Sequence, residues 1–292
     1  MKYKIKHSTT YQYADFVSLC QNQARLTPTS NHKQICHSSY IDILPPTTYL
    51  QEYTDYFNNK VTVFEIAKQH KKLTVTMVSE VELLAKSKID LTSVDMPWEK
   101  VRDILAIPNS KRLLRAAEFV LPSEYTPLEK EIITYAKVSF PPKINLIEGC
   151  KDLMARIFHD FQYDPGFTTI STPLSAVFAQ KRGVCQDFAH FALACLRSIG
   201  LAGRYVSGYI ETFPAEGEIK LEGADATHAW FAIFVPNYGW VDFDPTNNVL
   251  PSDQHITLAV GRDFSDVTPL KGVVFGGGSQ ILDVAVDMIR LE

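Results

Sequence analysis

Alternation of apolar and polar side chains dominates the first third of the chain. Residues 1–7 alternate between larger side chains and lysine, and residues 73–81 repeat the same period of two. This period is typical of a half-buried strand. Asn58-Asn59 separates two runs rich in aromatic and β-branched residues, 53–57 and 61–66, which predicts a hairpin. We therefore expect residues 1–95 to form a β-rich domain, an antiparallel sandwich or barrel-like sheet.

Beyond residue 95 the period becomes helical. Residues 97–105 predict a short helix that begins at a proline. Thr126 followed by proline and, three residues on, Glu129 predicts a second helix start. Residues 145–161 and 185–199 each place their apolar side chains on one helical face. We assign 96–125 to a connecting helical segment and 126–292 to a second domain.

Strands return after the helix that Gly200 is expected to end. Residues 204–211, 226–235 and 240–244 are short apolar runs, and residues 282–288 alternate again. The second domain is therefore predicted to begin with helices and to continue with strands, after the β-rich N-terminal domain.

Composition removes several classes of function. The 292 residues carry a net charge of −4 and 46% hydrophobic residues, so neither nucleic acid nor a membrane is an expected partner. Five cysteines without short repeated spacing predict neither a disulfide framework nor a zinc site. The N-terminus lacks the apolar core of a signal peptide. We expect a cytoplasmic protein without metal or cofactor, and the sequence does not predict its oligomeric state.

Cys185 is the strongest candidate for chemistry because it stands where a helix is predicted to begin. Free backbone N–H groups and the positive end of the helix dipole favour an anion at that position. A thiolate there would be a nucleophile for acyl transfer, with the N–H of the cysteine directed at an oxyanion. The alternative is a small buried hydrophobic residue, which is the commoner role of a single cysteine.

His228 is the candidate base, although a histidine in a strand as apolar as 226–235 is more often structural. The turn at 236–239 predicts that residues 240–244 run back beside it. A turn centred there would leave Asp244 three residues short of facing His228, so a bulge or a shifted turn is required. Asp242 and Asp244 share one face, and spacing alone does not choose between them.

These segments carry a resemblance. Gly-Val-Cys185-Gln-Asp-Phe-Ala, then His228-Ala-Trp, then Gly-Trp-x-x-x-Asp244-Pro-Thr resemble the three core motifs of the transglutaminase-like superfamily. Phe-Gln-Tyr163-x-Pro-Gly and the segment 260–269 are similar to its bacterial members, as is the β-rich first part. The resemblance therefore covers nearly the whole chain.

The resemblance implies a papain-like α+β core, with helices packed on an antiparallel sheet, preceded by an all-β N-terminal domain. It also implies a thiol mechanism with Cys185 as nucleophile, His228 as base and Asp244 as the acid that orients it. It selects Asp244 over Asp242. Candidates for the oxyanion hole or the cleft are Tyr163, Gln186, Asp187 and Trp230. Tyr163 could instead be a core aromatic, and Asp187 could simply complement the helix dipole.

The implied chemistry fits more than one reaction. Attack on an amide carbonyl gives a thioester, which water resolves in a peptidase or amidase and an amine resolves in a transglutaminase. We favour a hydrolase acting on peptide or protein amides, with a protein-glutamine amine transferase as the alternative. A binding module that kept the fold without the chemistry is a third hypothesis.

Overall fold

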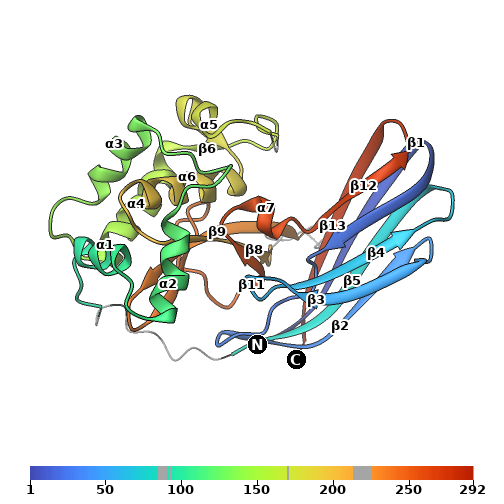
Figure 1. Cartoon of the computed structure of the whole chain (residues 1–292), viewed down its shortest axis with the longest axis horizontal. Coiled ribbons are helices and arrows are strands. Elements are labelled where there is room, and N and C mark those ends of the chain that lie inside the picture. The colour runs from blue at the N-terminus through green and yellow to red at the C-terminus, as the bar shows by residue number, and fades with distance from the viewer. Residues whose placement is uncertain (85–90, 92–93, 170, 213–224, 292) are drawn as a thin grey trace, which may run out of the picture.

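The computed structural model describes residues 1–84, 91, 94–169, 171–212 and 225–291, and these form two lobes (Figure 1). The sheet lobe is a seven-stranded antiparallel sheet, and the helical lobe packs helices against a four-stranded sheet. This is the α+β architecture expected from the sequence. Within the described residues no helix has both the length and the apolar character needed to cross a bilayer.

The sheet lobe is built around one 23-residue strand, β1. Its first half pairs with β5 and β13, and its second half pairs with β4 and β12. The hairpin predicted at Asn58-Asn59 is confirmed by the pairing of β3 with β4. The strands of this lobe are β1 (Lys2–Ala24), β2 (Gln34–Leu44), β3 (Tyr49–Thr54), β4 (Lys60–Ile66), β5 (His70–Leu83), β12 (Leu270–Gly276) and β13 (Gln280–Leu291).

The last two strands, β12 and β13, belong to the sheet lobe and not to the second domain predicted from the sequence. The sequence assigned 126–292 to the second domain, whereas β12 and β13 pair with β1 over most of its length. Alternation identified 282–288 as a strand, but a period of two carries no information about which strand is its partner. The helical lobe is thus inserted between β5 and β12.

The helical lobe surrounds helix α6, which packs against β8 and β9. Its four-stranded sheet has the order β10-β9-β8-β11 and is antiparallel throughout. Its helices are α1 (Trp98–Ala106), α2 (Lys111–Ala117), the short 3-10 helix η2 (Glu118–Val120), α3 (Lys130–Ser139), α4 (Leu146–Asp160), α5 (Leu174–Gln180), α6 (Cys185–Ser198) and α7 (Phe264–Val267). Its strands are β6 (Gln162–Tyr163), β7 (Arg182–Gly183), β8 (Gly203–Ile210), β9 (Ala226–Val235), β10 (Gly239–Phe243) and β11 (His255–Gly261).

The predicted helix boundaries are confirmed at α4 and α6 and wrong at α3. The Asn145 side chain caps α4 by accepting the Ile147 N–H at 2.9 Å. Gly200, with φ of 82°, follows the end of α6. Helix α3 begins four residues after Thr126, because the Thr126 hydroxyl accepts hydrogen bonds from Ser123 and from the buried Arg197 guanidinium instead of capping a helix.

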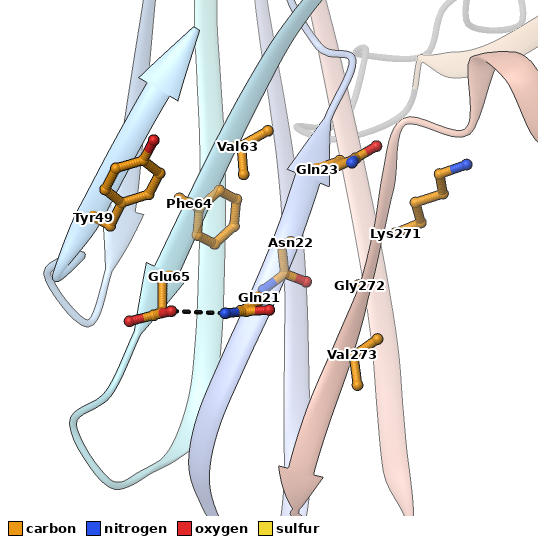
Figure 2. A pocket seen from close by; sticks show the side chains of 10 residues that line it. All are labelled: Gln21, Asn22, Gln23, Tyr49, Val63, Phe64, Glu65, Lys271, Gly272 and Val273. Atoms are coloured by element: carbon orange, nitrogen blue, oxygen red, sulfur yellow. Dashed lines mark hydrogen bonds between the residues drawn. The ribbon is translucent and has the colours of Figure 1, made fainter.

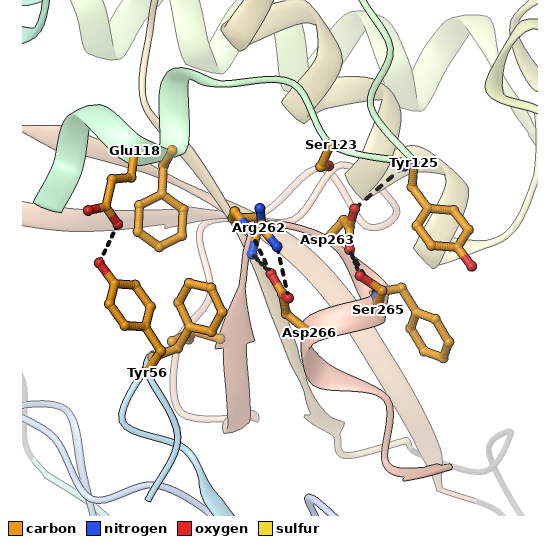
Figure 3. Close-up of polar contacts among 12 residues, drawn as sticks. Tyr56, Glu118, Ser123, Tyr125, Arg262, Asp263, Ser265 and Asp266 are labelled. Atoms are coloured by element: carbon orange, nitrogen blue, oxygen red, sulfur yellow. Dashed lines mark hydrogen bonds and ion pairs between the residues drawn. The ribbon is translucent and has the colours of Figure 1, made fainter. Parts of the chain in front are cut away.

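Polar contacts within and near the segment 260–269 are shown in Figure 3. Arg262 forms an ion pair with Asp266 at 3.0 Å, and Asp263 caps α7 while accepting the Tyr125 N–H. Nearby, the Tyr56 hydroxyl of the β3–β4 hairpin donates to Glu118 at 2.5 Å. The segment 260–269 therefore has a structural role within the helical lobe, close to a contact between the two lobes.

Candidate active site

Cys185 is the first residue of α6, as the sequence predicted, and its side chain is partly exposed. The turn before it is fixed by Asp187, whose Oδ2 accepts the Val184 N–H at 2.8 Å and the Thr168 hydroxyl at 2.7 Å. A Cβ on Gly183 would lie 2.8 Å from that same oxygen, so only glycine fits there. Since N–H groups in the first turn of a helix have no acceptor within the helix, they are free to bind an anion beside the thiol.

His228 and Asp244 meet across the β9–β10 hairpin. The turn is one residue shorter than predicted, because Gly239 rather than Trp240 lies opposite Val235. A shift of one residue moves every following side chain to the other face of the sheet. Asp244, just past the end of β10, consequently shares the face of His228.

The same register brings the two side chains within hydrogen-bonding distance. Continued past the end of β10, it places Asp244 opposite Trp230, which makes it a diagonal neighbour of His228. His228 Nε2 donates to Asp244 Oδ2 at 2.8 Å, and the imidazole and carboxylate are 6% and 0% exposed. The shifted turn that the sequence argument required is therefore present.

Asp242 has a different partner. It lies opposite Ala232, four residues along β9 from His228, whereas Asp244 lies opposite a residue only two from His228. The Asp242 carboxylate forms an ion pair with Lys33 of the sheet lobe instead. Burial raises the pKa of Asp242, but the charges of Lys33 and Arg204 outweigh burial and hold it below the usual range. The structure thus brings Asp244, and not Asp242, to the histidine.

The pair formed by His228 and Asp244 is strongly polarised. Burial lowers the pKa of His228, but the hydrogen bonds to Asp244 and to the Cys185 thiol outweigh burial and raise it to about 10. Burial raises the pKa of Asp244, yet hydrogen bonds from its neighbours hold it well below its usual range. With Nε2 directed at Asp244, Nδ1 is the ring nitrogen left for the thiol. His228 is therefore a charged bridge between thiol and carboxylate at neutral pH.

Two further residues bind the same carboxylate, and sequence reasoning missed both. His255 Nε2 donates to Asp244 Oδ2 at 3.1 Å, and Asn247 Nδ2 donates to it at 2.7 Å. Asp244 Oδ1 meanwhile accepts the Thr246 N–H at 2.9 Å. An aspartate at the start of a turn often accepts hydrogen bonds from the next few residues, so the turn could have predicted the contact with Asn247. His255 opens an apolar strand eleven residues away, and no local pattern connects it to Asp244.

Of the remaining predicted cleft residues, Tyr163 and Gln186 lie at accessible positions and Trp230 is buried. Tyr163 is 53% exposed, and the pairing of β6 with β7 sets it beside Gly183. Burial and the charge of Cys185 raise the pKa of Tyr163, which places the phenol near the thiol. Gln186 lines a pocket of about 330 Å³ beside α6. Trp230 is only 1% exposed and packs inside the lobe, so it does not line an open cleft.

The two histidines and the carboxylate form one compact, hydrogen-bonded cluster. One polar atom from each of His228, Asp244 and His255 lies within 4.8 Å of the other two. Both imidazoles donate to the same carboxylate oxygen, so shared protons hold the cluster together.

A larger hollow of about 800 Å³ lies on the sheet lobe (Figure 2). A hydrogen bond of 2.8 Å from Gln21 to Glu65 crosses it. Its lining contains neither cysteine nor histidine, so it offers no nucleophile or base. The residues that line it are Gln21, Asn22, Gln23, Tyr49, Val63, Phe64, Glu65, Lys271, Gly272 and Val273.

Comparison with known proteins follows the division into lobes. A family model described as the transglutaminase-like superfamily matches residues 139–245, and one described as the bacterial transglutaminase-like N-terminal region matches residues 3–82. An uncharacterised protein of Mycobacterium tuberculosis is 37% identical over 301 aligned residues, which cover 100% of this chain and 93% of the relative.

Two characterised or solved proteins are also similar. A protein-glutamine gamma-glutamyltransferase of Pseudomonas aeruginosa is 31% identical over 122 residues, covering 38% of this chain and 18% of that enzyme. The crystal structure of a proposed cysteine protease from Cytophaga hutchinsonii superposes with a TM-score of 0.75 at 19% identity, covering 100% of this chain and 92% of that one. The second likeness shows that both lobes occur together in another protein.

Proposed function

This chain belongs to the transglutaminase-like superfamily, and from the geometry of its site we propose that it is a thiol hydrolase of peptide or protein amides. Cys185 is the nucleophile, His228 the general base and acid, and Asp244 the residue that orients the imidazole. The observation that carries the proposal is the position of His228, which donates to Asp244 Oδ2 at 2.8 Å and lies near enough to the Cys185 thiol for the thiol to raise its pKa.

The reaction proceeds in two halves. The Cys185 sulfur attacks the amide carbonyl carbon, and the resulting oxyanion is stabilised by the Cys185 N–H and a second donor, for which we propose the Tyr163 hydroxyl. His228 gives its proton to the departing amine as the carbon–nitrogen bond breaks, which leaves a thioester. His228 then takes a proton from water, whose oxygen attacks the thioester and releases a carboxylic acid and the free thiol.

Water is the proposed second substrate because the thiol stands at a partly exposed position. Cys185 is partly exposed and Tyr163 is 53% exposed, so solvent contacts both the thiol and the proposed oxyanion donor. The Pseudomonas relative supports the alternative, in which an amine resolves the thioester. A binding module without chemistry is disfavoured because thiol, imidazole and carboxylate are all in place.

The test compares wild type with Cys185→Ala on a fluorescently labelled casein substrate, with and without a dansylated primary amine. Wild type should release peptides and the variant should not, while Cys36→Ala, a partly exposed cysteine of the sheet lobe, should keep full activity. Incorporation of the amine in preference to cleavage would favour the transferase. If a thioester is not detected by intact mass spectrometry and neither product forms, the enzyme proposal fails.

A further inference from the structure

Strand β11 (His255–Gly261) is the edge of the four-stranded sheet, and it carries His255. One side of β11 pairs with β8. Among the described strands none pairs with its other side. Backbone N–H and C=O groups on a buried edge need partners, because an unpaired polar group away from water is costly.

Two side-chain amides of the sheet lobe supply these partners. Gln34 Nε2 donates to the Thr257 carbonyl at 2.7 Å, and Gln34 Oε1 accepts the Thr257 N–H at 2.8 Å. Asn59 makes the same pair of bonds with Val260, both at 2.8 Å. Each amide is 1% exposed and reproduces the two hydrogen bonds that a neighbouring strand would make.

Apolar contacts with the sheet lobe also hold this strand. Ile256 and Leu258 of β11 belong to one buried cluster with Tyr3 and Ile5 of β1, and this cluster also includes Tyr209 of β8. Side chains packed at interior density have little freedom to shift. The position of β11 is therefore set by the sheet lobe as well as by β8.

His255 transmits this position to the active site. Its Nε2 donates at 3.1 Å to the same Asp244 oxygen that binds His228 at 2.8 Å. Its buried Nδ1 has no hydrogen-bond partner among the described residues. The indole ring of Trp230 stands edge-to-face with the imidazole at 5.3 Å. The ring is thus oriented by its strand, by Trp230 and by Asp244, and not by a bond at Nδ1.

We propose that the sheet lobe is part of the active centre, with His255 as a positioning residue for Asp244 and with Gln34 and Asn59 as the clamp that holds its strand. The catalytic consequence rests on the proposed function, whereas the control of the Asp244–His228 pair does not. His255 holds the carboxylate where its Oδ2 accepts the His228 Nε2–H, and so keeps the imidazole directed toward Cys185.

The first test replaces His255. His255→Leu should lower kcat about 10- to 100-fold with KM little changed, since one hydrogen bond to a charged group is lost. His255→Gln, whose amide nitrogen can take the place of Nε2, should restore most of kcat. The His228 ring signal of ¹⁵N-histidine-labelled protein, assigned with His228→Gln, should titrate at lower pH in His255→Leu than in wild type, because a carboxylate that is no longer held in place accepts the His228 proton less well. Titration at higher pH would show that His255 only competes for the Asp244 oxygen and would overturn the positioning role.

The second test replaces the clamp. Gln34→Leu and Asn59→Ala should lower kcat and shift the His228 titration in the same direction as His255→Leu. Tyr56→Phe is the matched control, because it removes a lobe-to-lobe hydrogen bond that does not touch β11. Circular dichroism identifies any variant that does not fold, and if one clamp variant fails the other still tests the clamp.

Each outcome has one meaning. Wild-type kcat and an unchanged titration in folded His255→Leu would overturn the positioning role. An effect of Tyr56→Phe as large as that of Gln34→Leu would overturn the clamp, because any contact between the lobes would then suffice. If wild type turns over no amide, the proposed function fails, and the His228 titration alone then decides whether the sheet lobe controls the pair.

Discussion

Replacement of Asp244 by asparagine should move the protonation of His228 toward its usual pH range. The folded pKa of His228 is raised from 6.5 to about 10, so the stabilisation from its charged form is present below pH 6.5 and is lost as pH rises through about 10. The amide in the Asp244→Asn variant would be neutral and would present no carboxylate to the Nε2–H. The imidazolium should therefore lose its proton at lower pH in the variant.

The size of the shift follows from the 2.8 Å bond. A hydrogen bond to a charged group contributes about 1.5–3 kcal/mol, and about 1.4 kcal/mol corresponds to one pH unit, so the expected shift is about one to two units. Because Asp244 is 0% exposed, solvent does not screen this interaction. The rate of catalysis near neutral pH should fall further than the change in His228 protonation alone would cause. The reason is that Asn247 and His255 also lose the carboxylate that accepts their hydrogen bonds.

The assay is alkylation of Cys185 by the anionic reagent iodoacetate across pH, read by peptide mass spectrometry. An imidazolium beside the thiol attracts iodoacetate, so the rate should decline as His228 loses its proton, whereas neutral iodoacetamide should show no such decline. Asp242→Asn is the control, since it alters a buried carboxylate of β10 that binds Lys33 instead. A decline at the wild-type pH in Asp244→Asn would refute the electrostatic argument.

Three further outcomes test the packing and titration of the fold. Gly208→Ala should lower the free energy of unfolding in urea by about 1–3 kcal/mol, because its Cβ would lie 2.2 Å from the Ile256 carbonyl oxygen. In the control Gly166→Ala the new Cβ would lie 3.6 Å from its nearest neighbour, so the free energy of unfolding should not change. Equal urea midpoints for the two variants would contradict the close contact described at Gly208. Burial lowers the pKa of His7 from 6.5 to about 4, so stability should decrease as pH falls through that window, less so in His7→Gln. In native protein, iodoacetamide should spare the fully buried Cys20 and Cys195, and rapid labelling of either would show that its lobe opens.

Local patterns predicted those parts of the molecule that local physics determines. The period of two identified β1 and β5, and the helical spacing after Cys185 identified α6 with Cys185 in its first turn. Asn58-Asn59 predicted the β3–β4 hairpin because asparagine tolerates the positive φ of 70° found at Asn58. These features depend on residues that are close in sequence.

The parts that were not predicted depend on distant partners or on a single residue of register. The turn from Val235 to Gly239 uses positive φ at Asn237 and at Gly239, and its length decided which face Asp244 occupies. Thr126 has a helix-capping sequence, but its hydroxyl binds Arg197, which is 71 residues away. His255 contacts Asp244 only after β8 and β11 have paired. A single sequence does not reveal such contacts, because no periodicity connects the partners.

The length of β1 has a consequence for synthesis of the protein. Lys2 pairs with Leu291, and Ala24 pairs with Leu270, so one flank of the first strand waits for strands made about 250 residues later. A nascent chain that has completed β11 already contains Cys185, His228, Asp244 and His255, yet β1 still exposes an unpaired edge at the ribosome. Pairing across so many residues closes a very large loop and folds slowly. We therefore expect this edge of β1 to stay open to incorrect pairing until β12 and β13 have been synthesised.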